Sequence, residues 1–243
     1  MKIITLNVWA GRVSQKLVNF FDQNNTIDVF CLQEVYHNGI EDNDTKLKDY
    51  EIFSKIKKVL PCHRSYFRPH LLGHYGLAIF SKKEIEVLEE GDVFVHKYKG
   101  YIPEENLGFH ARNIQYIKIK HNNKNLTILN FHGLWNNQGK TDTEDRIQQS
   151  KNILDFIQKI DGEIILCGDF NLLPETESIK IFESNGLVNL IKKYEINSTR
   201  TSLYEKPDKF ADYVFVTKGV NAKDLKVLPD EVSDHSALLL EIE

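Results

Sequence analysis

Residues 163–171 constrain the fold more than any other stretch of the chain. Their sequence, Glu-Ile-Ile-Leu-Cys-Gly-Asp-Phe-Asn, begins as an apolar run typical of a strand buried on both faces. The run stops abruptly, which puts Asp169 and Asn171 at the carboxyl end of the predicted strand. Open α/β sheets bind their ligands at that end. Asp and Asn are also common turn residues, so this stretch alone leaves an ordinary turn open.

The same pattern occurs at four other apolar runs of the sequence. Asn7, Glu34 and His132 each end such a run, and Asp234 and His235 stand just before another. Strand ends that carry carboxylates, amides and imidazoles predict one convergent site. Chemistry is therefore expected at one edge of the sheet structure.

The order of apolar patterns predicts a layered α/β (α+β) fold. A strand at 2–9, an amphipathic helix at 13–24 and a strand at 27–35 make a βαβ-like unit. Further strands are predicted at 62–70, 76–81, 84–95, 112–120, 126–131, 163–169, 210–216, 222–228 and 237–242, and loops at 36–45, 97–110, 133–140 and 192–209. Two facing sheets with helices outside accommodate this order.

Local signals mark the helices of the second half. Thr141 and Glu144 have capping-box spacing ahead of a helix with apolar residues at helical intervals. Pro174 suits the first turn of a helix over 175–183, which Asn185-Gly186 would end.

Composition limits what the chain can do. Its 243 residues are 41% hydrophobic and contain no Pro/Gly/Ser-rich linker, so we expect a single domain over residues 1–243. The balance of 31 Lys+Arg against 35 Asp+Glu gives a net charge of −4, which excludes a general basic field for nucleic acid but not a local basic groove.

Three cysteines without CxxC spacing favour reduced thiols. With no leader and no apolar run near the roughly 18 residues of a membrane span, we expect a cytoplasmic monomer without membrane insertion.

Seven short motifs together resemble those of the endonuclease/exonuclease/phosphatase superfamily, the deoxyribonuclease I-like metal-dependent phosphohydrolases. In order along the chain they are Leu6-Asn7-Val8, Leu32-Gln33-Glu34, Gly76-Leu-Ala-Ile-Phe-Ser81, Asn130-Phe-His132, Gly168-Asp-Phe-Asn171, Ala211-Asp-Tyr-Val-Phe215 and Ser233-Asp-His235. The resemblance covers residues 3 to 240. It implies a four-layered α/β/β/α sandwich in which two mixed sheets pack face to face with helices outside.

The resemblance also implies two roles. Asp212 would orient His235, because a histidine that stabilises charge needs a carboxylate to hold its ring. Arg112 matches a position where nuclease members contact substrate, so a bidentate phosphate contact is expected. A surface arginine at a strand end is the alternative for Arg112.

The residue types themselves suit metal-assisted phosphoryl transfer. Mg²⁺ prefers hard oxygen ligands and keeps several waters, so few protein ligands suffice, and Mn²⁺ is the alternative ion. Glu34 is the predicted ligand, with Asn7 supporting it and Asp234 contributing.

Four further residues complete the predicted chemistry. Asp169 would orient and help deprotonate a water, and Asn171 would hold that water or donate to a phosphate oxygen. His132 and His235 would hydrogen-bond phosphate oxygens as negative charge builds. For His132, a core histidine with a satisfied ring is the alternative.

The sequence therefore predicts an enzyme: a divalent-metal-dependent phosphodiester hydrolase acting on DNA or RNA, in which water attacks phosphorus in line. No Cys or Ser lies in an activated nucleophile motif. A phosphoesterase for a small phosphorylated molecule or lipid headgroup is the second hypothesis, and a non-catalytic binding protein is the third. Tyr75, Trp9 and Trp135 would stack on a base or simply pack. Segments 97–110 and 133–141 are where selectivity would be set.

Overall fold

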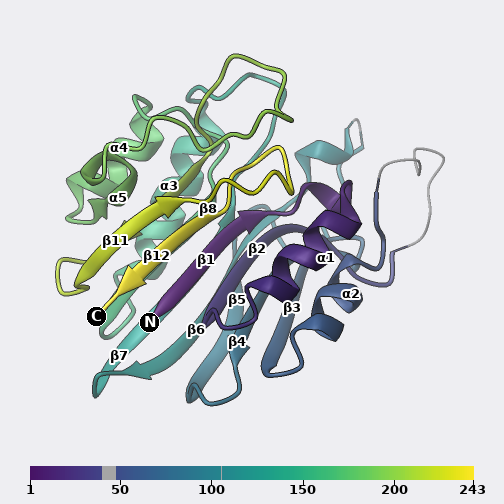
Figure 1. Ribbon diagram of the computed structural model, residues 1–243. Coiled ribbons are helices and arrows are strands. Elements are labelled where there is room, and N and C mark those ends of the chain that lie inside the picture. The colour runs from purple at the N-terminus through teal and green to yellow at the C-terminus, as the bar shows by residue number, and fades with distance from the viewer. Residues whose placement is uncertain (40–47, 105) are drawn as a thin grey trace.

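The computed structural model describes residues 1–39, 48–104 and 106–243. The predicted turn at 36–45 therefore lies partly outside the described residues. Two sheets pack face to face, and helices cover their outer faces (Figure 1). The predicted fold class, an α/β/β/α sandwich with two mixed sheets, is confirmed.

Each sheet is mixed, with one parallel pair. In the first sheet the parallel pair is β1 (Lys2–Asn7) with β2 (Val29–Tyr36), and in the second it is β7 (Lys124–His132) with β8 (Glu163–Asp169). The first sheet has the spatial order β11 (Ala222–Val227), β12 (Leu238–Ile242), β1 (Lys2–Asn7), β2 (Val29–Tyr36), β4 (Tyr75–Lys82), β3 (His63–Leu71). The second has the order β5 (Val87–His96), β6 (Arg112–His121), β7 (Lys124–His132), β8 (Glu163–Asp169), β10 (Asp212–Val216), β9 (Val188–Asn189).

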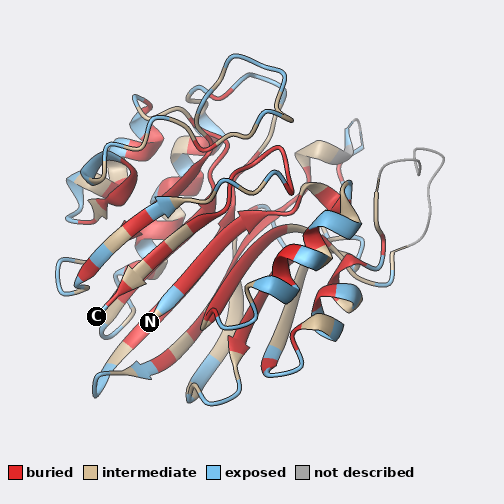
Figure 2. Cartoon of the chain, viewed as in Figure 1, coloured by how far each residue is buried: buried red, intermediate tan, exposed pale blue. Residues whose placement is uncertain are grey.

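The helices lie outside both sheets. The first sheet is covered by α1 (Ser14–Gln23) and α2 (Ile52–Val59), and the second by α3 (Glu144–Ile157), α4 (Glu177–Ser184) and α5 (Leu190–Lys193) (Figure 1). Their outer surfaces are exposed while the central strands are buried (Figure 2). None of the helices in the described part of the chain is long and apolar enough to cross a membrane.

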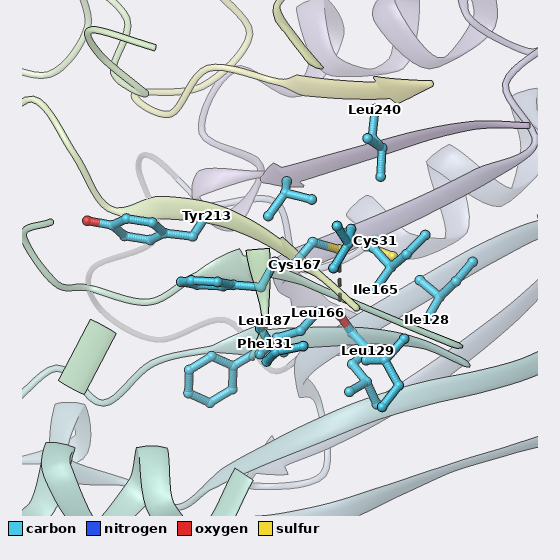
Figure 3. Packing of buried hydrophobic residues seen from close by; sticks show 14 of the residues in the cluster. Cys31, Ile128, Leu129, Phe131, Ile165, Leu166, Cys167, Leu187, Tyr213 and Leu240 are labelled. Atoms are coloured by element: carbon cyan, nitrogen blue, oxygen red, sulfur yellow. Dashed lines mark hydrogen bonds between the residues drawn. The ribbon is translucent and has the colours of Figure 1, made fainter. Parts of the chain in front are cut away.

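Alternation along the strands explains the layers. In β1, Ile3 packs between the sheets, whereas Ile4 and Leu6 pack beneath the helices with Phe21 of α1. Successive side chains of a strand point to opposite faces of the sheet, so one apolar strand can contribute to two cores. Figure 3 shows the layer between the sheets, where Cys31 of β2 meets residues of β7 and β8. Burying each such side chain contributes about 1.5–3 kcal/mol.

Several local predictions were wrong in detail. The N-cap of α3 is Thr143, whose hydroxyl accepts a hydrogen bond from the Arg146 amide, and not Thr141. Pro174 precedes α4, which begins after the N-cap Thr176. The short β9 and α5 were not predicted.

Candidate active site

Strand pairing brings three of the predicted site residues into one row. His132 at the end of β7 is in register with Asp169 at the end of β8. On the other side of β8, Asp169 is in register with Asp212 at the start of β10. Ends of strands far apart in the sequence therefore meet on one edge of the second sheet.

The first sheet contributes Asn7 and Glu34 to the same edge. The side-chain amide nitrogen of Asn7 donates to Glu34 Oε1 at 3.1 Å and to Asp169 Oδ2 at 2.9 Å. Its amide oxygen accepts from the backbone N–H of Trp9 at 2.9 Å. Asn7 thus links carboxylates from both sheets, while its oxygen is engaged by the backbone.

An irregularity in β2 presents Glu34. The pairing of β2 with β4 shifts register between Leu32 and Val35, and Glu34 has φ +57°. Positive φ is uncommon for residues other than glycine, and such strain gathers at functional sites. Burial raises the pKa of Glu34, the Asn7 hydrogen bond opposes this shift, and the charge of Asp234 adds to it.

Asp169 is the centre of the site. It is 1% exposed, and its Oδ1 accepts from the Asn171 backbone N–H at 2.8 Å. Its Oδ2 lies 3.5 Å from His235 Nε2 and 3.7 Å from His132 Nε2. Burial alone would raise the pKa of Asp169, but His235, His132 and nearby cations outweigh burial and lower it. The carboxylate is therefore kept ionised.

The pKa values of the two histidines are shifted in opposite directions. Nδ1 of His235 lies 2.9 Å from both carboxylate oxygens of Asp212. Although burial lowers the pKa of His235, the charge of Asp212 raises it, and the net pKa is raised. Burial and Arg112 lower the pKa of His132 to about 3, so His132 is neutral.

Glu34, His132, Asp169 and His235 line an open cleft of about 440 Å³. The cleft also contains Trp9, Arg12, Tyr75, Gly108, His110, Arg112, Trp135, Lys140, Asn171, Arg200, Tyr204, Lys206 and Asp234. Its acidic part is formed by Glu34, Asp169 and Asp234.

Comparison with known proteins agrees with this geometry. The sequence profile described as the Endonuclease/Exonuclease/phosphatase family matches residues 4–235. The chain belongs to this family. A search of curated protein sequences finds no match.

Solved structures share the fold of this family member over its whole length. A mannosyl-6-phosphatase from Bacteroides thetaiotaomicron has TM-score 0.79 at 17% identity, covering 100% of this chain and 99% of that one. A humanized D. rerio TDP2 has TM-score 0.73 at 16% identity, covering 100% and 98%. The human Nocturnin catalytic domain has TM-score 0.72 at 18% identity, covering 100% and 93%. At these identities the likeness shows the fold.

Among the residues that the structure describes, two groups of side chains have the geometry to hold a metal ion. In each, the potential ligand atoms lie within 4.8 Å of one another. The groups are Glu34, His132 and Asp169, and Asp169, Asp212 and His235. The first supplies two carboxylates, which match the oxygen preference of Mg²⁺. Asp234, also predicted as a ligand, accepts from Arg200 Nη1 at 3.2 Å and belongs to neither group.

The two predicted substrate-binding residues lie in the cleft wall. Asn171 has φ +55°, and its amide nitrogen donates to the Gly133 carbonyl at 3.2 Å. Arg112 is 2% exposed rather than on the surface, and its Nε donates to the same carbonyl at 3.0 Å. Its guanidinium also contacts the ring of His110. A phosphate contact by either residue stays a prediction.

Among the cleft residues that sequence reasoning missed are Lys140, Arg200, Tyr204 and Lys206. Lys140 lies in segment 133–141, where selectivity was expected. The other three lie in the stretch 192–209, which has no periodic pattern that could have placed them. Trp9, Tyr75 and Trp135 were noted in the sequence, and all three line the cleft.

Proposed function

We propose that this protein is a divalent-metal-dependent phosphodiester hydrolase, with DNA or RNA as the leading substrate class, and that residues 1–243 act as one catalytic domain. The observation that carries the proposal is the setting of Asp169. Its carboxylate lies within 4 Å of two histidine nitrogens and shares an amide donor with Glu34. A carboxylate beside imidazoles and a second carboxylate suits hydrolysis of a phosphate ester.

Glu34 would hold the metal, with Asn7 positioning its carboxylate and Asp234 contributing. We propose Mg²⁺, with Mn²⁺ as the alternative. A bound divalent cation would offset the phosphate charge and stabilise the leaving oxygen. The raised pKa of Glu34, which reflects the cost of its buried negative charge, supports a cation at this position.

Asp169 would orient the attacking water and accept its proton. The lowered pKa of Asp169 keeps the carboxylate ionised and ready to accept a hydrogen bond. His235, held by Asp212, would donate from Nε2 to a phosphate oxygen as charge builds. His132 is neutral and would donate a second hydrogen bond, and Asn171 would hold the water or donate to the phosphate.

Aromatic and cationic side chains around the cleft support a nucleic-acid substrate. The Arg12 guanidinium carbon lies 5.0 Å from the ring centroid of Trp9, and Trp135 and Tyr204 line the cleft farther along. Sequence-tolerant binding of single strands combines base stacking with a local cationic groove. A local groove is compatible with the net charge of −4. The free cysteines support a reducing, cytoplasmic setting.

A small phosphorylated molecule is the second candidate substrate. The cleft volume of about 440 Å³ lies in the range that encloses small ligands. The mannosyl-6-phosphatase among the structural neighbours has a small sugar phosphate in its name and matches this chain over its full length.

The test is hydrolysis of a substrate panel with and without Mg²⁺. The panel contains end-labelled single- and double-stranded DNA and RNA, a chromogenic phosphodiester and a hexose monophosphate. Asp169→Asn and His235→Ala should each lower turnover by roughly 10²-fold or more, because a base or a charge-stabilising donor is lost. Lys151→Gln, an exposed change on α3, is the control. If the folded, metal-loaded protein hydrolyses none of these substrates, the proposal is overturned.

Salt separates the two substrate classes. A chain of phosphates held by several cations releases counterions, so affinity should fall steeply with salt concentration. A small phosphate ester makes few such contacts and should respond weakly. The salt slope measured on whichever substrate is hydrolysed therefore assigns the class.

A further inference from the structure

Three cations line the cleft beside its acidic part and have no substrate contact assigned to them above. Lys140 comes from the loop between β7 and α3, and Arg200 and Lys206 come from the long loop between α5 and β10. This second loop extends above the strand ends in Figure 1. Two segments remote in sequence thus supply positive charge to one place.

Lys140 is a buried cation of the cleft wall. The residue is 3% exposed, and its ammonium donates to the Phe210 carbonyl at 3.0 Å. Within residues 1–39, 48–104 and 106–243, it has no carboxylate within 4.0 Å. A buried charge is costly unless it is paired. Burial and the neighbouring Arg200 lower its pKa to about 8, and the charges of Asp169, Asp212 and Asp208 only partly oppose this shift.

Arg200 is fixed beside the proposed active site. Its backbone forms an antiparallel bridge with His235, and its Nη1 donates to Asp234. Its side chain is 7% exposed, and its buried Nε has no hydrogen-bond partner in the described part of the chain. A rigid guanidinium with an unused donor is suited to an oxyanion.

Aromatic rings pack against these three cations. The Tyr204 ring centroid lies 4.0 Å from the Arg200 guanidinium carbon and 4.9 Å from the Lys140 ammonium. The Lys206 ammonium lies 5.5 Å from the centroid of Trp135. Ring faces attract cations without neutralising their charge. The charges of Lys140 and Lys206 therefore stay available to a ligand, while that of Arg200 is shared with Asp234.

We propose that Lys140, Arg200 and Lys206 form a subsite for a second phosphate group of the substrate, adjacent to the phosphate that is hydrolysed. This inference rests on the proposed function, because it takes the acidic part of the cleft as the reaction centre. The substrate class is a molecule with at least two phosphates. Either a neighbouring phosphodiester in a nucleic acid or the second phosphate of a small bisphosphorylated compound has this chemistry.

Binding in the absence of hydrolysis tests the subsite directly. Inorganic pyrophosphate is titrated calorimetrically into the protein with a chelator present. Its dissociation constant should rise about tenfold in Lys140→Gln and in Lys206→Gln, should stay near the wild-type value in Lys140→Arg, and should not change in Lys151→Gln. Because Lys206 is exposed, its variant keeps the test valid if Lys140→Gln does not fold. Equal dissociation constants in folded wild type and Lys206→Gln would overturn the subsite.

Kinetics identify the source of the second phosphate. One arm compares a dinucleotide with and without a 5′-phosphate, and the other compares a hexose bisphosphate with a hexose monophosphate. In the arm that matches the substrate class, kcat/KM is higher for the compound that carries the second phosphate. Lys206→Gln should reduce this gain in kcat/KM about tenfold. No effect in either arm refutes the subsite, even if hydrolysis is observed. Lysine-dependent pyrophosphate binding without hydrolysis of any substrate refutes the proposed function and with it the role of the subsite in a substrate, and it leaves only an anion-binding site.

Discussion

His235 and Asp212 form a buried pair in which one imidazole nitrogen, Nδ1, lies 2.9 Å from both oxygens of the carboxylate. The Asp212 backbone N–H is itself bound to the hydroxyl of Thr199 at 3.2 Å. The pair therefore has its own support and fixes which nitrogen of His235 faces the cleft. Nε2 is left free to point at Asp169, 3.5 Å away.

Asp212→Asn should lower kcat by roughly 10²-fold, because the partner that orients a functional histidine is usually worth one to two orders of magnitude. An amide cannot stabilise the imidazolium as a carboxylate does, and it also removes the cause of the raised pKa of His235. The measurement is single-turnover hydrolysis of the best substrate at saturating Mg²⁺. The thermal midpoint of the variant serves as the folding control. Turnover within twofold of wild type would show that the pair is only structural.

Glu34→Gln should raise the stability of the metal-free protein and weaken metal binding. The pKa of Glu34 is raised, so the folded chain holds a proton more tightly than the unfolded chain, and stability is lost as pH rises through the folded pKa. At pH 7 a neutral glutamine removes this cost, and the thermal midpoint without metal should rise by about 2–4 °C for each 1 kcal/mol gained.

The same variant should lose its response to Mg²⁺. In wild type, metal at about 100 times its dissociation constant should add about 2.7 kcal/mol of stability. Thermal scans with Mg²⁺ and with chelator measure both effects. If Mg²⁺ stabilises Glu34→Gln as much as wild type, Glu34 is not the principal ligand.

Strand ends were predictable from the sequence because buried strands have a strong apolar signal. Asp169 and His132 each follow such a run, and parallel pairing then places both residues on one sheet edge. Asn7 and Glu34 were found by the same reasoning in the first sheet. Membership of the family was likewise readable, since its motifs coincide with these strand ends.

Loop geometry was not predictable. Arg200 reaches the site through a backbone bridge to His235, a contact between residues far apart in the sequence that leaves no local pattern. The positive φ of Glu34 depends on the register shift against β4 and not on residue type. The N-cap of α3 was misplaced because Thr141 and Thr143 are both good cap residues, and residue type does not show which of them accepts from the Arg146 amide.

Acid should destabilise the protein partly through His96 at the end of β5. Burial lowers the pKa of His96 from 6.5 to about 4. Between these values the unfolded chain binds a proton that the folded chain does not, so the free energy of unfolding falls as pH decreases through this window. Urea unfolding at pH 7.5 and pH 5 should show a loss that is smaller in His96→Gln, by on the order of 1 kcal/mol. Parallel pH profiles for the two proteins would assign the acid sensitivity to other groups.

Gly168, next to Asp169 in β8, should tolerate no side chain. It has φ +139°, and an added Cβ would lie 2.0 Å from the Phe131 carbonyl oxygen of β7. Backbone atoms of a central sheet cannot move aside cheaply, so Gly168→Ala should destabilise the fold by about 3 kcal/mol.

Gly186→Ala is the matched control for this prediction, because Gly186 has φ +90° but no atom within 4 Å of the added Cβ. It tests conformational strain without collision and should cost about 1–2 kcal/mol. Urea unfolding measures both variants, and hydrolysis is measured on the folded fraction. Equal losses would mean that the close approach of β7 to Gly168 adds nothing beyond strain. A larger loss in Gly168→Ala, with activity also reduced, would show that this contact between β7 and β8 sets the position of Asp169 relative to His132.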